Sequence, residues 1–125
     1  MLEKAASLGD VALHASTPTL QAGKLGIYVL QDGGRTLVNG RPFYKLDGSG
    51  SKAFLYHYKN GHWKVGKDTG DANCWLNARD SAMTPDLITA QWRVWDGTVK
   101  SWEDAPSVGI TSRGEYGNEH AMQQQ

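Results

Sequence analysis

The sequence predicts a mainly β fold, a small antiparallel sheet that forms either a sandwich or a partly open barrel built from hairpins. Three observations lead to this prediction. Turn-forming Asx-Gly dipeptides recur along the chain, short runs rich in Val, Ile, Tyr, Trp and Phe lie between them, and no periodic apolar stretch is long enough for a helical domain. The dipeptides are at residues 32–33, 39–40, 47–48, 60–61 and 96–97.

Length and composition predict a single core. A chain of 125 residues has the commonest size of one domain. Its hydrophobic fraction of 39% is modest, but five Trp and five Tyr supply large side chains for burial. We expect a β module over residues 23–111, an N-terminal extension over residues 1–22 and a C-terminal tail over residues 112–125. The two ends are weakly apolar and are expected to be flexible, becoming ordered only against a partner.

The best-specified hairpin covers residues 53–65, AFLYHYKNGHWKV. A two-residue type I′ turn at Asn60-Gly61 would place Tyr58 opposite Trp63 and Tyr56 opposite Val65. This register predicts one apolar face, made of Phe54, Tyr56, Tyr58, Trp63 and Val65.

A second hairpin is expected over residues 91–102, QWRVWDGTVKSW. A turn at residues 96–97 would pair Val94 with Val99 and Trp92 with Ser101. Trp95 then lies on the face opposite to Trp92, where it is either buried by a second layer or exposed as a platform.

A third hairpin follows from LVNGRPFYKL, residues 37–46. A turn at residues 39–40 pairs Val38 with Arg41 and Leu37 with Pro42, and the proline favours an edge strand. The stretch is therefore interpreted mainly as a corner of the fold. Residues 25–30 and 108–111 are expected to be strands that pair side by side, and Pro85 is expected to begin a helical turn.

Several short stretches follow a pattern in chain order. GIYVL contains a Tyr-containing strand, and VNGRPFYK contains an Asn-Gly-Arg-Pro-aromatic-Tyr step. AFLYHYKNGHWKVGKDTG contains a Tyr-Leu-Tyr-like strand and a Trp-x-Val-Gly step, and QWRVWDG, followed by SWEDAPSVGI, contains a Trp-x-Val-x-Asp-Gly step. The pattern resembles a short aromatic- and Gly-rich β module of predicted algal and protist proteins and of some animal multidomain proteins. The resemblance covers residues 26–110 in a single copy. It implies a compact unit that is often appended or repeated, and it implies no activity for any named residue.

The charge balance argues against nucleic acid as a partner. Thirteen basic and thirteen acidic residues cancel, so no overall field attracts phosphates or anionic lipids. Single-stranded nucleic acid would require rings for stacking and a lysine track, for which the candidates are Lys52, Lys59, Lys64 and Lys67.

Cys74 is the only cysteine, which excludes an intrachain disulfide. A reducing, intracellular location, in the cytoplasm or an organelle interior, is therefore expected. No apolar run approaches the roughly 20 residues of a transmembrane helix, so a soluble chain is expected.

The sequence predicts no catalytic residue, no metal site and no cofactor. His57, His62, Cys74 and Asp80 include the elements of a nucleophile, a base and an orienting acid, but no motif connects them. The loop at residues 68–73 is superficially similar to a calcium loop, yet it departs from the EF-hand order and is expected to be a turn with Asx hydrogen bonds.

These features predict a non-catalytic protein-interaction module, an accessory or assembly subunit that packs on other protein subunits of a larger complex. Trp, Tyr and Arg dominate interface energetics. The expected partner- or ligand-binding residues are therefore Arg41, Tyr44, Trp95 and Trp102. The alternative is a carbohydrate-binding module, in which exposed Trp and Tyr platforms stack on glycan rings.

Overall fold

A computed structural model describes residues 9–48 and 52–114, and it is mainly β as predicted. In this part of the chain nine strands form one antiparallel sheet in the order β10-β9-β8-β7-β6-β5-β2-β1-β11. The strands are β1 (Val11–Ala15), β2 (Gly26–Leu30), β5 (Tyr44–Leu46), β6 (Phe54–His57), β7 (His62–Gly66), β8 (Leu76–Arg79), β9 (Arg93–Asp96), β10 (Ser101–Asp104) and β11 (Val108–Ser112).

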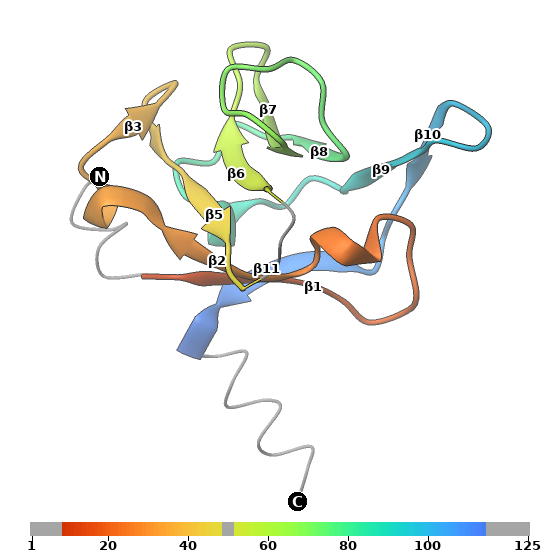
Figure 1. Cartoon of the computed structure of the whole chain (residues 1–125), viewed down its shortest axis with the longest axis horizontal. Helices are drawn as coiled ribbons and strands as arrows, with labels where there is room; N and C mark the ends of the chain where they lie inside the picture. The colour runs from red at the N-terminus through yellow and green to blue at the C-terminus, as the bar shows by residue number, and fades with distance from the viewer. Residues whose placement is uncertain (1–8, 49–51, 115–125) are drawn as a thin grey trace, which may run out of the picture.

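The sheet curls on itself, because its two edge strands are consecutive in the chain. Only residues 105–107 separate β10 from β11. A flat sheet of nine strands would hold its edges roughly 38 Å apart, whereas a link of this length reaches at most about 14 Å. The Ala105 N–H donates to Trp92 O (2.9 Å), and the Ser16 N–H donates to Ser107 O (3.2 Å), so the link is bonded towards both ends of the sheet. The result is a partly open barrel (Figure 1).

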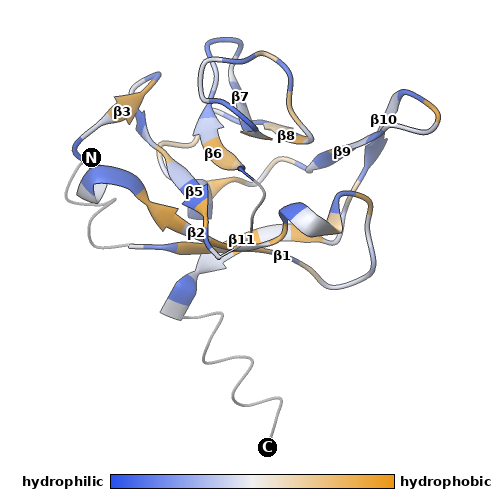
Figure 2. Ribbon diagram, viewed as in Figure 1, coloured by the Kyte–Doolittle hydropathy of each residue, from blue (hydrophilic) through white to orange (hydrophobic). Residues whose placement is uncertain are grey.

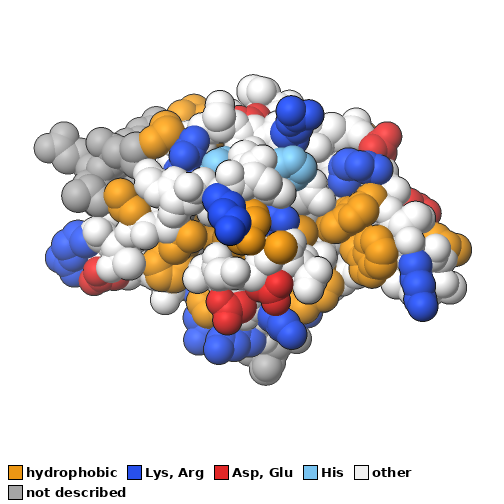
Figure 3. Space-filling model, turned by 90° about the horizontal axis from the view of Figure 1, so that it is seen from above, with side chains coloured by type: hydrophobic (Ala, Val, Ile, Leu, Met, Phe, Trp, Pro, Cys, Tyr) orange, Lys and Arg blue, Asp and Glu red, His pale blue; other side chains and the backbone are white. Residues whose placement is uncertain are grey.

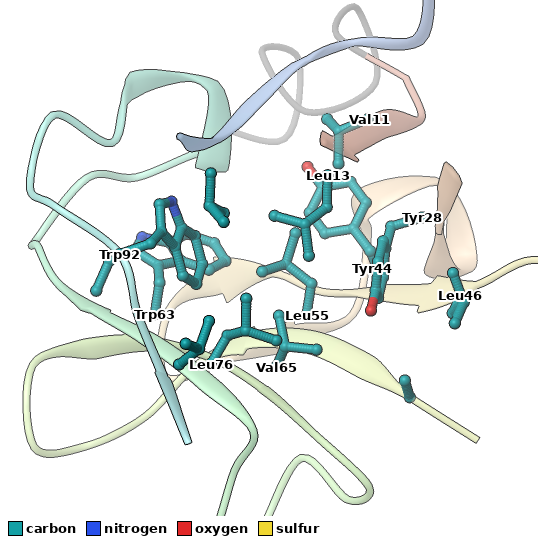
Figure 4. Packing of buried hydrophobic residues seen from close by; sticks show 14 of the residues in the cluster. Val11, Leu13, Tyr28, Tyr44, Leu46, Leu55, Trp63, Val65, Leu76 and Trp92 are labelled. Atoms are coloured by element: carbon teal, nitrogen blue, oxygen red, sulfur yellow. The ribbon is translucent and has the colours of Figure 1, made fainter. Parts of the chain in front are cut away.

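The interior of the curled sheet is the hydrophobic core (Figure 4). Alternate residues of the strands point inward, as the period of two in a β-strand requires. Figure 2 shows β2 as a hydrophobic stretch followed by the hydrophilic turn η2 (Gln31–Gly34). The fully buried core side chains include Val11, Tyr28, Tyr44, Leu55, Trp63, Val65 and Leu76.

The hairpin at residues 37–42 has the predicted register. Strands β3 (Leu37–Val38) and β4 (Arg41–Pro42) form a separate two-stranded sheet, with Leu37 opposite Pro42 and Val38 opposite Arg41. Asn39 and Gly40 both have positive φ, 51° and 77°, which is the signature of a type I′ turn.

The register predicted for residues 53–65 is wrong by one residue. His57 lies opposite Trp63 and Tyr56 lies opposite Lys64. The reason is a three-residue loop in place of the two-residue turn: the Gly61 N–H donates to Tyr58 O (3.0 Å), and Gly61 alone in this loop has positive φ, 90°. Trp63 therefore faces the core, whereas Tyr56 lies on the opposite face of the sheet, where it is buried and bonded to the loop at Asp71.

The register predicted for residues 91–102 is also wrong. Trp95 pairs with Trp102, and residues 97–100 form a four-residue loop. The loop is longer than predicted because the Asp96 carboxylate accepts the backbone N–H groups of Thr98 (2.9 Å) and Val99 (3.3 Å), and Lys100 adopts φ 55°.

Residues 25–30 and 108–111 do form strands, β2 and β11, but β1 lies between them. Strand β1 lies within residues 1–22, where a flexible extension was expected. The residues of β1 instead belong to the sheet. The expected C-terminal tail and residues 1–8 lie almost entirely outside the described residues.

Short helical turns complete the fold. They are η1 (Ala22–Lys24), η2 and η3 (Pro85–Leu87), and Pro85 begins η3 as predicted. In the part of the chain that the structure describes, no helix has the length and apolar character needed to cross a membrane.

Candidate functional site

A groove with a volume of about 810 Å³ lies on the outer surface of β7, β8, β9 and β10. Its size is typical of small-molecule sites. The loop at residues 67–74 forms one wall. Seen from above, hydrophobic side chains gather on the side of the molecule where β9 and β10 lie, next to Lys and Arg side chains (Figure 3).

Three tryptophans form one row across the groove. Leu76 pairs with Val94 in the core, and continuing this register by one residue places Trp75 opposite Trp95; the Trp95 N–H accordingly donates to Trp75 O (2.9 Å). Trp95 in turn pairs with Trp102. Because paired Cα atoms are about 5 Å apart, the three indoles span roughly 10 Å of sheet.

The rings of the row are only half buried. Trp95 and Trp102 meet edge to face, with their centroids 5.5 Å apart and their planes at 61°. The Lys24 ammonium from η1 lies 3.9 Å from the ring centroid of Trp75, so one face of this indole carries a cation–π contact. Trp95 is further fixed through its backbone, since Gln21 Nε2 donates to Trp95 O (2.9 Å).

A second, polar row runs beside the tryptophans. It follows the cross-strand pairs from Tyr56 to Lys64, Asn77, Arg93 and Asp104. Successive outward residues along a strand are about 7 Å apart. Of the polar row, Lys64 and Asn77 line the groove together with the tryptophans. Three asparagine amides line the groove, those of Asn60, Asn73 and Asn77.

The loop wall is held by two side chains of the sheet. The Tyr56 hydroxyl donates to Asp71 O (2.7 Å), and Lys64 Nζ donates to Ala72 O (2.7 Å). Gly66 permits this close approach, since a Cβ on it would lie 2.9 Å from Asn73 O. The groove therefore depends on a glycine where the loop crosses β7.

Within the loop, Asp68 Oδ1 accepts the Gly70 N–H and Asp71 Oδ1 accepts the Asn73 N–H, both at 2.9 Å. These are the Asx hydrogen bonds that were predicted for residues 68–73. Cys74 follows directly and also lines the groove. Burial raises the pKa of its thiol, which favours the neutral form of the group.

No known protein family, curated protein or solved structure matches this chain. The candidate site therefore rests on its own geometry.

Two of the four residues predicted to bind a partner, Trp95 and Trp102, are brought together in the groove. The prediction for Tyr44 is wrong, because its side chain is fully buried in the core. Tyr44, on β5, lies opposite Leu55 of β6. Because side chains of a strand alternate between the two faces of the sheet, the Tyr44 ring points into the core together with the Leu55 side chain. Burial also raises the pKa of its hydroxyl.

Arg41 is not free for a partner either, because its guanidinium is bonded to backbone carbonyls. Nη1 donates to Asn39 O (3.0 Å), Nη2 donates to Ser81 O (2.7 Å), and Nε donates to Ala82 O (3.3 Å). Trp63 Nε1 also donates to Ala82 O (2.9 Å). Arg41 thus ties the β3–β4 hairpin to the segment after β8, and the NGRPFY stretch is a corner of the fold, as predicted.

The four residues considered for catalysis fall in two separate places, His57 with the Asp80 backbone and His62 with Cys74. His57 is buried, with Nδ1 accepting from Asn39 Nδ2 (2.7 Å) and Nε2 donating to Asp80 O (3.0 Å). Cys74 and His62 lie instead on the groove. Across the described ranges, no three His, Cys, Asp or Glu residues are grouped closely enough to hold a metal ion.

The Asp80 carboxylate has a structural role of its own. Its oxygens accept the backbone N–H groups of Ala82 (2.8 Å), Thr89 (2.9 Å) and Ala90 (3.0 Å). Burial alone would raise the pKa of this group, but these hydrogen bonds to the charged form lower it. Asp80 therefore pins the turn that contains η3.

Sequence reasoning missed Trp75, Asn77 and Lys64 as groove residues. The signal for the first two was present: in WLNA, residues 75–78, large or polar residues alternate with Leu76 and Ala78, the pattern of a half-buried strand. From the sequence Lys64 is a candidate only for a lysine track along phosphates, and the covering loop is what brings it into the groove.

Proposed function

We propose that this chain is a non-catalytic binding module whose groove holds a carbohydrate. The observation that carries the proposal is the row of Trp75, Trp95 and Trp102 beside a polar row on the same surface. Flat indole rings suit the apolar faces of sugar rings, and the asparagine amides can both donate to and accept from hydroxyl groups.

The chemistry of the groove supports binding rather than turnover. His62 Nδ1 lies 3.3 Å from Asn77 Oδ1, and no nucleophile in hydrogen-bond reach accompanies it among the described residues. Burial favours the neutral thiol of Cys74, which is the weak nucleophile of the two protonation states. Retention of a ligand without a chemical step is the role that these groups fit.

The proposal is tested by titrating the folded chain with a panel of soluble polysaccharides and following tryptophan fluorescence. Binding of at least one glycan should occur, and Trp95→Ala and Trp102→Ala should each weaken it by about tenfold or more while leaving the far-ultraviolet circular dichroism unchanged. Leu87→Ala is the control, because this side chain is 51% exposed and does not line the groove. Absence of binding across the panel would refute the proposal.

A second candidate function is docking on other protein subunits as an accessory subunit. It is favoured by β10, an edge strand whose Trp102 lies in the groove, so that a partner segment could extend the sheet and contact the indole at once. The single cysteine is in keeping with a function inside the cell.

The native size of the endogenous protein distinguishes this candidate. Gel filtration of a gentle lysate should place the chain in a much larger particle if it is an assembly subunit, and Trp102→Ala should release it. Elution near the chain's own mass of 13.7 kDa would contradict assembly and favour glycan binding.

A further inference from the structure

The groove is a cationic site as well as an aromatic one. Its lining includes Lys64 and Lys67, and no Asp or Glu is part of the lining that the structure describes. The nearest loop carboxylates, Asp68 and Asp71, accept hydrogen bonds from their own loop. The whole chain has no net charge, so the positive charges of this groove produce a local field. Such a field attracts anionic ligands to the groove.

Lys64 is the unusual member of this set. Its side chain is only 5% exposed, and its ammonium donates to Ala72 O at 2.7 Å and lies 4.7 Å from the ring centroid of Tyr58. In the described residues no carboxylate comes within ion-pair distance of it. An ammonium has three donors and is costly to bury without a counter-charge, and the hydrogen bond to Ala72 O uses only one of them, so an anionic group is the ligand chemistry that suits Lys64 best.

The position of Lys64 points towards the tryptophan row. Lys64 pairs with Asn77 across β7 and β8, and Asn77 is the next outward residue after Trp75 on the same strand. A ligand whose anionic group binds Lys64 would therefore place its neighbouring atoms over the tryptophan row.

We propose that the glycan of this groove is acidic, with a carboxylate or sulfate group that binds Lys64 and is supported by Lys67 at the rim. This inference rests on the proposed carbohydrate function. Single-stranded nucleic acid fits less well, because only two of the four lysines considered for a phosphate track, Lys64 and Lys67, line the groove. The asparagine amides favour hydroxyl-rich ligands over a polyphosphate.

The test uses matched pairs of polysaccharides that differ in charge: polygalacturonate and its methyl ester, and heparin and its desulfated, carboxyl-reduced form. The acidic member of at least one pair should bind about tenfold more tightly than its neutral partner, as a charge-assisted hydrogen bond allows. Lys64→Met should weaken binding of the acidic member more than binding of its neutral partner, because the variant removes the charge as well as the hydrogen bond that holds the loop wall at Ala72 O.

Two further variants keep the test decisive if Lys64→Met does not fold. Lys67→Gln, at an exposed groove lysine, should reduce the preference for the acidic member, whereas Lys45→Gln, at an exposed lysine outside the groove, should not.

The outcomes separate the two proposals. Equal binding of acidic and neutral members, lost in Trp95→Ala, would overturn the acidic-glycan inference and leave the carbohydrate function standing. No binding to any glycan would overturn the carbohydrate function itself. Polyglutamate or oligothymidylate binding as tightly as the best acidic glycan would show that the groove recognises a peptide or nucleic-acid anion, and would also overturn the inference.

Discussion

The indole of Trp95 meets the indole of Trp102 edge to face across β9 and β10, with ring centroids 5.5 Å apart. This geometry suits the quadrupoles of the two rings and is worth about 0.5 to 1.5 kcal/mol beyond the area that they bury. A double-mutant cycle of Trp95→Ala and Trp102→Ala in urea unfolding should give a coupling of this size. Strictly additive effects would show that the rings do not stabilise one another in solution.

Two buried tyrosines should respond differently to loss of the hydroxyl group. The Tyr28 hydroxyl donates to Lys24 O (2.6 Å), whereas the Tyr44 hydroxyl is buried with no hydrogen-bond partner in the described part of the chain. Tyr28→Phe should cost about 1 kcal/mol of unfolding free energy, and Tyr44→Phe should be neutral or stabilising. A large loss for Tyr44→Phe would reveal a partner for that hydroxyl, such as a buried water.

Arg41→Ala should weaken folding rather than ligand binding, because the guanidinium holds the carbonyl groups of Asn39, Ser81 and Ala82. We expect a loss of about 1 to 3 kcal/mol in thermal or urea unfolding. Arg35→Ala is the matched control: Arg35 makes an exposed ion pair with Asp32, and its removal should change little. If Arg41→Ala instead lost glycan affinity and kept its stability, Arg41 would be a binding residue after all.

His57 should make stability depend on pH. Burial lowers the pKa of its ring below the usual value for histidine, and Arg41 and His62 act in the same direction, while Asp80 opposes the change. Because the unfolded chain takes up the proton more readily, the contribution is complete above about pH 6.5 and is lost as the pH falls towards the lower folded-state pKa.

The measurement is the unfolding free energy of the native chain and of His57→Gln between pH 7.5 and 5. The native chain should lose more stability over this range than the variant does. Parallel curves would mean that the pKa of His57 is the same in the folded and the unfolded chain.

Gly61→Val should destabilise the β6–β7 hairpin, because φ at this position is 90° and a β-branched residue strongly disfavours that region. A loss of about 1 to 2 kcal/mol is expected. Gly23→Ala is the control, since φ at Gly23 is not positive and a Cβ there would meet nothing within 4 Å. An unchanged melting temperature for Gly61→Val would contradict the loop conformation.

The turn type could be predicted from the sequence where a single dipeptide forms the entire loop between two strands. Asn39-Gly40 both take positive φ, and the β3–β4 register follows. The same reasoning failed at residues 60–61 and 96–97, because an Asx-Gly pair also fits loops of three or four residues. Each added loop residue moves every side chain of the following strand to a new partner.

Three features were predictable from sequence: the mainly β class, the strands expected at residues 25–30 and 108–111, and the structural role of NGRPFY. They depend on alternation and on the backbone preferences of a few neighbouring residues. Tertiary structure decided which tryptophans share a surface. Trp75, Trp95 and Trp102 come together only through the β8–β9–β10 registers, and Lys64 enters the groove only because the loop at residues 67–74 crosses β7 at Gly66. Those choices are set by burying Leu55, Trp63 and Val94 in one core, a non-local gain in free energy that no short stretch of sequence expresses.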